Sequence, residues 1–231
     1  MLNPIFCALD RPDLEGTLAL VRSLAPHVGG IKLGLEFFAA QGPRGVEAVA
    51  RLGLPIFLDL KLHDIPNTVA GAVREVVRLG VAMLTLHASG GRAMLEAAVA
   101  ATTAAEAPPA LLGVTVLTSL DATDLAEIGV APEAAAQALH LARLAVASGL
   151  AGLVCSPHEI RGLRSAFGPA PRIVVPGIRP LEAADDQKRV MAPAEALAQG
   201  ADLLVIGRPI TRAPDPAAAA ARIAAALRPA T

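Results

Sequence analysis

The segment FLDLKLHDIPNTV, residues 57–69, contains a strand, a turn and the start of a helix in direct succession. Because successive side chains of a strand point to opposite faces, Asp59 and Lys61 project to the same side, about 6.5–7 Å apart at Cα. Asp64 follows at the turn, and Pro66 suits the first turn of the next helix. The segment therefore predicts a strand–helix unit that carries opposite charges where its strand ends.

The same order of elements recurs along the whole chain. Short β-type runs alternate with helical stretches whose apolar residues are three and four apart, such as Ala134–Ala147, and Gly or Pro marks many junctions. The runs lie near Ile5–Leu9, Gly30–Leu33, Ile56–Leu60, Met83–Leu86, Leu111–Leu117, Gly152–Cys155, Arg172–Val175 and Leu203–Ile206. A barrel of the (β/α)8 type closes with eight such units. We therefore predict an α/β fold, a TIM barrel that residues 1–231 form as a single domain, with an open doubly wound sheet as the alternative.

Charge and composition narrow the class of protein. The chain has 20 Lys and Arg against 21 Asp and Glu, whereas proteins that bind nucleic acid or membrane surfaces carry a basic surplus. Trp and Tyr are absent, so few aromatic rings are available for stacking on single-stranded bases. No apolar stretch reaches the roughly 18 residues of a membrane-spanning helix, and no secretory signal is evident. We expect a cytoplasmic protein with no nucleic-acid or membrane partner.

The cysteines and histidines do not indicate a metal site. Cys7 and Cys155 lie within apolar runs, where free thiols are usually buried, and the chain has no CxxC pair or Cys/His cluster. We expect two buried thiols and no bound metal. His63 and His87 lie nearest to the predicted strand ends, and we expect them to have a structural role behind the side chains of the site.

Polar and charged side chains gather where the predicted strands end. In a barrel of this kind these ends meet at one mouth, which is where active sites lie. Charged groups are costly in otherwise apolar strands unless they are paired, so the strand ends predict a functional site. Its candidate residues are Asp10, Lys32, Asp59, Lys61, His87, Thr118, Gly177, Arg179, Gly207 and Arg208. A cluster of ion pairs that only holds the strands in register is the alternative that spacing leaves open.

These residues lie in motifs that resemble those of the orotidine 5'-phosphate decarboxylase family. The run FLDLKLHDIPNTV resembles the family's signature, in which an Asp-x-Lys-x-x-Asp motif forms the reaction centre. The resemblance continues in order through ALD (8–10), IKLG (31–34), HASGG (87–91), VTVLTSL (114–120), VCS (154–156), PGIRP (176–180), DQKRV (186–190) and VIGRPIT (205–211). It implies a (β/α)8 homodimer that converts orotidine 5'-monophosphate to UMP, with active sites at the subunit interface.

Carried over position by position, the resemblance assigns roles to individual residues. It implies a charged centre of Lys32, Asp59, Lys61 and Asp64, with Lys61 as the proton donor. The implied binding residues are Asp10 and Lys32 for the ribose hydroxyls, Asp59 beside the substrate carboxylate, Thr118 in the loop over the pyrimidine, Arg179, Gln187, Gly207 and Arg208 for the phosphate, and Asp64, Ile65 and Thr68 for the partner's site.

The implied chemistry is consistent with these residue types. Loss of CO2 from C6 of the pyrimidine leaves an electron pair in the ring plane, which the π-system cannot absorb. No Schiff-base or pyridoxal-type electron sink is evident, so we expect no cofactor and stabilisation by preorganised charge. The Lys61 ammonium would stabilise the developing carbanion and protonate it, while Asp59 would crowd a carboxylate that departs as neutral CO2.

The residues that would bind the substrate phosphate can be predicted from the ends of the last two strands. In barrels, phosphates commonly bind at the loops after strands seven and eight, where PGIR (176–179) and IGRP (206–209) stand. Arg179 and Arg208 can each make paired, charge-assisted hydrogen bonds to a phosphate. The segment 180–193, which contains Gln187, is predicted to be a lid that closes over the phosphate.

Two other functions compete with this interpretation. Metal-dependent sugar-phosphate enzymes of the same barrel group share the Asp-x-Lys-x-x-Asp motif, but they carry an acidic residue on strand two, where this chain has Lys32. A catalytically inactive, nucleotide-binding barrel is the second alternative. The intact charged centre argues against it, since burying charges is costly.

Overall fold

Eight parallel strands close into a barrel, in the order in which they occur along the chain. The computed structural model describes residues 3–130, 133–179 and 191–227. The strands are β1 (Ile5–Leu9), β2 (Gly30–Leu33), β3 (Ile56–Leu62), β4 (Met83–His87), β5 (Ala110–Val114), β6 (Gly152–Val154), β7 (Arg172–Val175) and β8 (Leu203–Ile206). The pairing of β1 with β8 closes the ring, so the predicted TIM barrel is confirmed and the open sheet is not.

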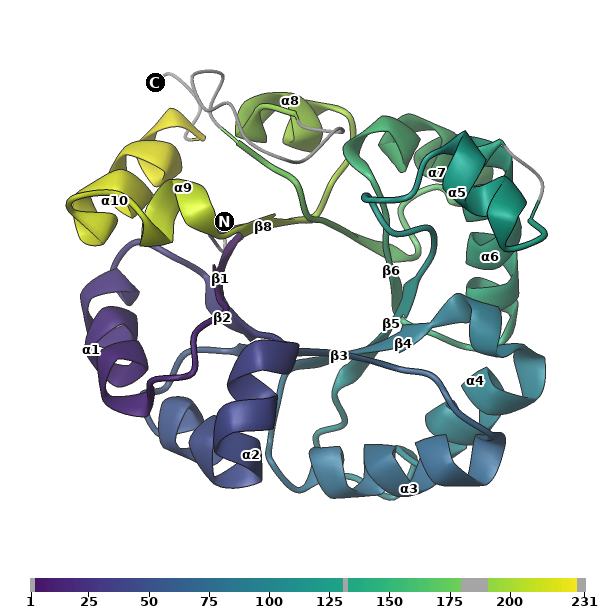
Figure 1. Cartoon of the computed structure of the whole chain (residues 1–231), viewed down its shortest axis with the longest axis horizontal. Helices are drawn as coiled ribbons and strands as arrows, with labels where there is room; N and C mark the ends of the chain where they lie inside the picture. Colours follow the sequence, from purple (N-terminus) through teal and green to yellow (C-terminus); the bar gives the residue numbers. More distant parts are fainter. Residues whose placement is uncertain (1–2, 131–132, 180–190, 228–231) are drawn as a thin grey trace.

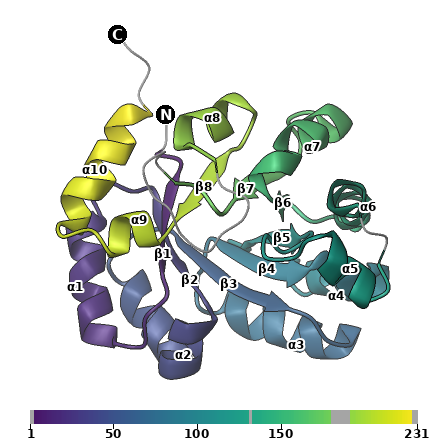
Figure 2. The same cartoon turned by 45° about the horizontal axis from the view of Figure 1, so that its top comes forward.

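Helices surround the ring of strands on all sides (Figure 1). They are α1 (Leu14–Leu24), α2 (Leu35–Ala50), α3 (Pro66–Val77), α4 (Arg92–Ala100), α5 (Ala122–Glu127), α6 (Ala134–Ala147), α7 (Ile160–Phe167), α8 (Pro193–Ala198), α9 (Arg208–Thr211) and α10 (Pro216–Ala226), with 3-10 turns η1 (Ala88–Gly90) and η2 (Pro157–Glu159). Helices α1 and α10 lie side by side where the barrel closes between β1 and β8 (Figure 2). As predicted, α3 begins at Pro66.

The ends of β3 and β5 at the mouth differ from the sequence-based expectation by two residues or more, whereas those of β4 and β6 differ by one. Strand β3 continues to Leu62 instead of ending at Leu60, because its pairing with β4 is interrupted and then resumes. Strand β5 ends at Val114, and the apolar residues Val116 and Leu117 that follow it line a cavity. Their apolar character therefore reflects the cavity wall and not a longer strand.

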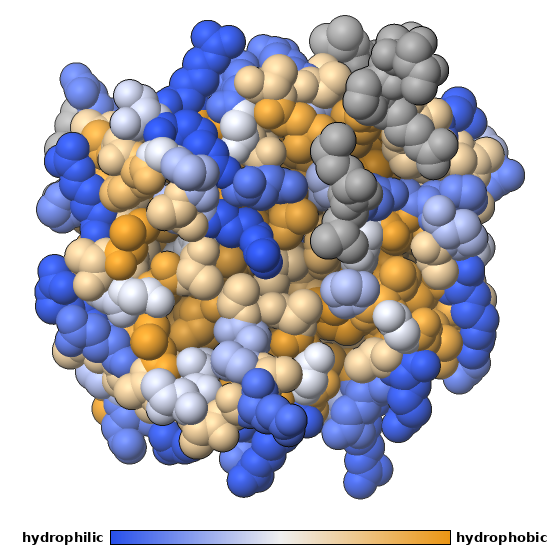
Figure 3. Space-filling model, turned by 180° about the vertical axis from the view of Figure 1, so that it is seen from behind, coloured by the Kyte–Doolittle hydropathy of each residue, from blue (hydrophilic) through white to orange (hydrophobic). Residues whose placement is uncertain are grey.

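The apolar residues form two cores. The larger one lies between the strands and the helices, and its members include Leu33, Phe37 and Leu84, all fully buried. Parallel strands covered on both faces are apolar along most of their length, which explains the near-continuous apolar runs in the sequence. On the face turned away in Figure 1, hydrophilic side chains gather around the outline and apolar ones nearer the middle (Figure 3).

The smaller core fills the inside of the barrel. Its residues are Phe6, Ala8, Phe57, Met83, Leu112, Val174 and Val205. The rings of Phe6 and Phe57 meet edge to face, with centroids 6.4 Å apart. This arrangement is favourable for aromatic pairs. The barrel is therefore a packed core and not a channel.

The structure also tests two expectations from the sequence: that the two cysteines are buried, and that no helix spans a membrane. Cys7 and Cys155 are free and buried, as predicted, and burial raises the pKa of the Cys7 thiol to about 12. Within the described ranges, none of the helices combines the length and the apolar character needed to cross a membrane.

Candidate active site

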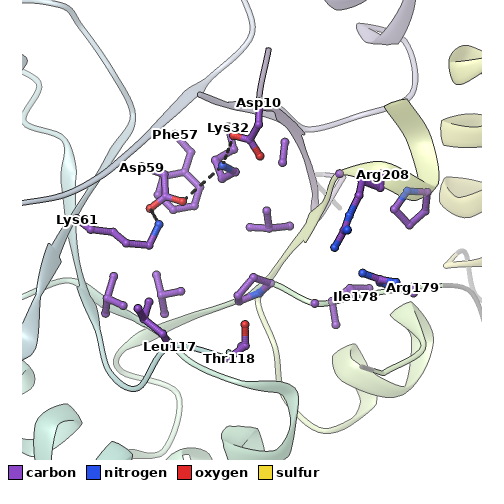
Figure 4. A pocket seen from close by; sticks show the side chains of 18 of the residues that line it. Asp10, Lys32, Phe57, Asp59, Lys61, Leu117, Thr118, Ile178, Arg179 and Arg208 are labelled. Atoms are coloured by element: carbon purple, nitrogen blue, oxygen red, sulfur yellow. Dashed lines mark hydrogen bonds and ion pairs between the residues drawn. The ribbon is translucent and has the colours of Figure 1, made fainter. Parts of the chain in front are cut away.

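A cavity of about 570 Å³ opens at the C-terminal ends of the strands. Nine of the predicted site residues line it: Asp10, Lys32, Asp59, Lys61, Thr118, Gly177, Arg179, Gly207 and Arg208. They come from segments far apart in the sequence, and the close-up shows the labelled ones around one space (Figure 4). The barrel thus brings the charged strand ends together at a single mouth.

The charges on β2 and β3 and directly after β1 form an array of alternating sign. Lys32 Nζ lies 3.0 Å from Asp10 Oδ1 and 3.5 Å from Asp59 Oδ2, and Lys61 Nζ lies 2.9 Å from Asp59 Oδ1. Two ammonium groups and two carboxylates leave this array without net charge. Asp10 extends the array beyond Lys32, and the place of Asp64 in the charged centre stays a prediction.

Burial strengthens the interactions of this array. The side chains of Lys32 and Asp59 are 9% and 14% exposed, whereas that of Lys61 is 28% exposed and faces the cavity. Burial raises the pKa of Asp59, but the charges of Lys32 and Lys61 and hydrogen bonds from Lys61 and Thr85 outweigh it and lower this pKa below its usual 3.8. Asp59 is therefore a carboxylate at neutral pH.

The backbone of β3 is irregular where it carries these charges. Leu58 pairs with Leu84 and Leu62 with Leu86, so the register with β4 shifts between the two pairs. Lys61 has a φ of 52°, and among the residues that the structure describes it is the only one other than glycine with a positive φ. For a residue with a Cβ this left-handed conformation costs about 1–2 kcal/mol. Such strain is typical of functional sites.

Two glycines make room at the mouth. A Cβ on Gly34 would collide with Asp10 Oδ1 and lie 3.0 Å from Lys32 Nζ, so only glycine leaves space for this ion pair. Gly177, after β7, has a φ of 74°, which glycine adopts at little cost. The turn at Gly177 leads the chain to Arg179.

The two arginines lie on the opposite side of the cavity from Asp59 and Lys61 (Figure 4). Arg179 follows β7 and is buried, and its backbone N–H donates to Met191 O at 3.0 Å. Arg208 begins α9, directly after Gly207 and β8. The cavity therefore has an ion-paired end and a cationic end that suits an anion.

An apolar wall joins the two ends. It consists of Val114, Val116, Leu117, Val154, Cys155 and Ile178. Burial, and next to it the charge of Glu159, raises the pKa of the Cys155 thiol, so this cysteine is a wall residue and not a thiolate nucleophile. The wall suits a flat, mostly apolar group between two charged regions. Sequence reasoning missed most of these residues, because apolar strand ends do not differ from core residues in pattern.

Comparison with known proteins identifies the family. The family model described as "Orotidine 5'-phosphate decarboxylase / HUMPS family" matches residues 3–223. The chain belongs to this family. A relative from Paramagnetospirillum magneticum, named orotidine 5'-phosphate decarboxylase, is 55% identical over 98% of this chain and 99% of its own, and one of the same name from Moorella thermoacetica is 54% identical over 97% and 92%. The family membership that the motifs predict is therefore confirmed.

Solved structures agree with this membership. The crystal structure of orotidine 5'-phosphate decarboxylase from Lactobacillus acidophilus has a TM-score of 0.86 and 37% identity, covering 98% of this chain and 99% of that one. An uncharacterized conserved protein from Geobacillus kaustophilus has a TM-score of 0.84 and 34% identity, with 97% and 100% covered. The barrel is thus shared along almost the whole length of these chains.

Three of the residues that the family resemblance predicted lie outside the cavity of their own chain. Asp64, Ile65 and Thr68 stand between β3 and the first turn of α3, and all three are exposed. Asp64 Oδ1 accepts a hydrogen bond from the Ile65 N–H at 2.6 Å, and Ile65 is 66% exposed. Gln187, predicted for the phosphate, lies outside the described residues.

Two histidines stand next to each other, His63 directly after β3 and His87 at the end of β4. The rings of His63 and His87 have centroids 5.4 Å apart. Burial, followed by electrostatic repulsion from His63 and Lys61, lowers the pKa of His87 below 6.5. At neutral pH His87 is therefore uncharged and adds no positive charge next to Lys61.

The low pKa of Asp59 predicts a pH-dependent contribution to stability. A carboxyl whose pKa is depressed in the folded state stabilises the fold above its unfolded pKa, about 3.9, and this stabilisation is lost as the pH falls through the folded pKa. We expect the free energy of unfolding of the unmodified protein, minus that of Asp59→Asn, to be constant down to about pH 5 and to decrease below about pH 4. Urea denaturation between pH 3 and pH 6.5 measures it. A difference that stays constant or grows on acidification would contradict the assigned pKa direction.

Proposed function

We propose that this chain removes the carboxylate of orotidine 5'-monophosphate to give UMP, the last step of de novo pyrimidine nucleotide synthesis. The observation that carries the proposal is the Lys61 ammonium, which faces the cavity while Asp59 holds it at 2.9 Å. The curated relatives at 50–55% identity bear the name of this activity. A cavity with an ion-paired end, an apolar wall and a cationic end matches a substrate with a carboxylate, a pyrimidine ring and a phosphate.

In the proposed mechanism, charge that is already in place stabilises the transition state. The bond between C6 and the carboxylate breaks, CO2 leaves, and the electron pair stays on C6 in the ring plane. The Lys61 ammonium stabilises this pair and then transfers a proton to C6, and solvent reprotonates the amine. Asp59 places a negative charge near the substrate carboxylate, and this repulsion disappears when neutral CO2 forms.

The remaining residues would orient the substrate. Asp10 and Lys32, held together at 3.0 Å, would hold the ribose hydroxyls. Thr118, half-buried in the loop after β5, would lie over the pyrimidine. The phosphate would be bound by Arg179, Arg208, the Gly207 backbone and Gln187. Binding energy from the phosphate, far from C6, can then be used to hold C6 against Lys61. No step in this scheme needs a metal or a cofactor.

We further propose a homodimer in which Asp64, Ile65 and Thr68 complete the partner's site. Residues 63–68 are all exposed, although they adjoin the charged array, and the exposed side chain of Ile65 is apolar. These side chains are therefore free of contacts with the core of their own chain and available for a subunit contact. The buried free thiols are typical of a reducing compartment, which supports a cytoplasmic location.

A direct assay tests the activity. Orotidine 5'-monophosphate is mixed with the protein and the change in ultraviolet absorbance is followed, with and without EDTA. We expect turnover that EDTA does not alter, because the proposed centre consists of lysine and aspartate side chains alone. Loss of activity in EDTA that Mg²⁺ restores would assign the chain to the metal-dependent sugar-phosphate enzymes instead. No turnover under either condition would indicate an inactive barrel.

Complementation tests the shared site. Lys61→Ala and Asp64→Ala chains are each expected to be inactive, but a mixed dimer has one site with both residues and one with neither. Random reassortment makes about half of the dimers mixed, and half of their sites are whole, so about a quarter of the activity should return. The two variants are unfolded and refolded together, with each refolded alone as the control. Verified mixed dimers with no more activity than the parents would place Asp64 in its own chain's site.

A further inference from the structure

Thr85 lies behind the charged array, in the middle of β4. It is fully buried and is the only polar residue of that strand before His87 at its end. Its hydroxyl accepts a hydrogen bond from the backbone N–H of Lys61 at 2.9 Å and donates one to Asp59 Oδ1 at 2.9 Å. One buried hydroxyl thus contacts both of the residues that the reaction requires on β3.

The direction of these two hydrogen bonds is fixed. The backbone N–H of Lys61 can only donate, so the Thr85 oxygen must accept, and its single proton is left for the Asp59 carboxylate, which can only accept. Asp59 Oδ1 accepts this hydrogen bond from Thr85 and a second one from Lys61 Nζ at 2.9 Å, while Oδ2 faces Lys32. The Thr85 hydroxyl therefore determines which carboxylate oxygen points to which lysine.

The same hydroxyl also replaces a missing strand contact. Where the register of β3 and β4 shifts, the ladder between Leu58 and Leu62 is broken, and the N–H of Lys61 bonds to a side chain instead of a carbonyl. A buried N–H needs a partner, and the left-handed backbone of Lys61 persists only if its surroundings hold it there. Thr85 supplies that partner at the point of strain.

We infer that Thr85 is a positioning residue for the decarboxylation, acting through Asp59 and the backbone of Lys61 to aim the Lys61 ammonium into the cavity. The inference rests on the proposed function. Thr85 is not among the described residues that line the cavity, so it does not contact the substrate. Its effect is therefore expected on the rate of the chemical step and not on substrate binding.

Kinetics of three substitutions test this role. Thr85→Val keeps the shape and removes the hydroxyl, and we expect kcat to fall about 10- to 100-fold, as for a misplaced catalytic group, with KM changed less than about threefold. Thr85→Ser keeps the hydroxyl and should remain within about threefold of the unmodified protein in both constants. Thr17→Val is the matched control, because Thr17 in α1 is equally buried but donates to the carbonyl of Asp13, the residue before that helix. It should leave kcat unchanged.

A second measurement is independent of activity. Hydrogen exchange of the Lys61 amide, followed by NMR, should become at least about tenfold faster in Thr85→Val and stay slow in Thr85→Ser, since only the hydroxyl protects that N–H. If the unmodified protein does not decarboxylate orotidine 5'-monophosphate, the proposed function fails, while amide exchange still tests the positioning. If Thr85→Val does not fold, Thr85→Ala replaces it.

Three outcomes would overturn the inference. The first is a kcat for Thr85→Val within threefold of the unmodified protein. The second is an equal loss of kcat in Thr85→Val and Thr85→Ser, which would show that altered packing, and not the absence of the hydroxyl, causes the loss. The third is unchanged exchange of the Lys61 amide in Thr85→Val.

Discussion

The carboxylate of Asp59, held between the ammonium groups of Lys32 and Lys61, is the interaction on which the rest of the site depends. An isolated charge in a buried position is costly, and removing one partner from a buried pair leaves the other uncompensated. The alternating series Asp10, Lys32, Asp59 and Lys61 avoids this cost, because each inner member has an opposite charge on both sides. The barrel brings these residues together by placing the ends of β1, β2 and β3 side by side.

The array is stable as a whole, yet its last member is only loosely enclosed. Lys32 and Asp59 are buried among the strands, whereas Lys61 reaches into the cavity from a strained backbone. This combination suits a group that must approach a substrate while keeping its proton and its charge. The fold accordingly holds a locally unfavourable conformation at the point where chemistry is proposed, with a regular, closely packed barrel around it.

Much of this arrangement follows from the sequence, because apolar runs bounded by Gly and Pro repeat eight times and charges stand at their ends. From the sequence, the strand-end rule predicts that Asp10, Lys32 and Arg208 meet at one mouth. It did not find Thr85, because the hydroxyl meets Lys61 only through a register shift that the period of a strand does not reveal. The lone polar residue within the apolar run MLTL, residues 83–86, was the available signal. The place of Asp64 in the charged centre was inferred from a motif and stays a prediction, because Asp64 is exposed in its own chain.

The central claim is that the Lys61 ammonium stabilises and protonates the carbanion at C6. The most direct measurement is the rate of orotidine 5'-monophosphate decarboxylation by Lys61→Ala, with circular dichroism and sedimentation to verify its fold and assembly. The account predicts a correctly folded protein with less than about 1% of the original rate, since both the stabilising charge and the proton are removed. A folded Lys61→Ala protein that keeps more than a few per cent of the rate would contradict it.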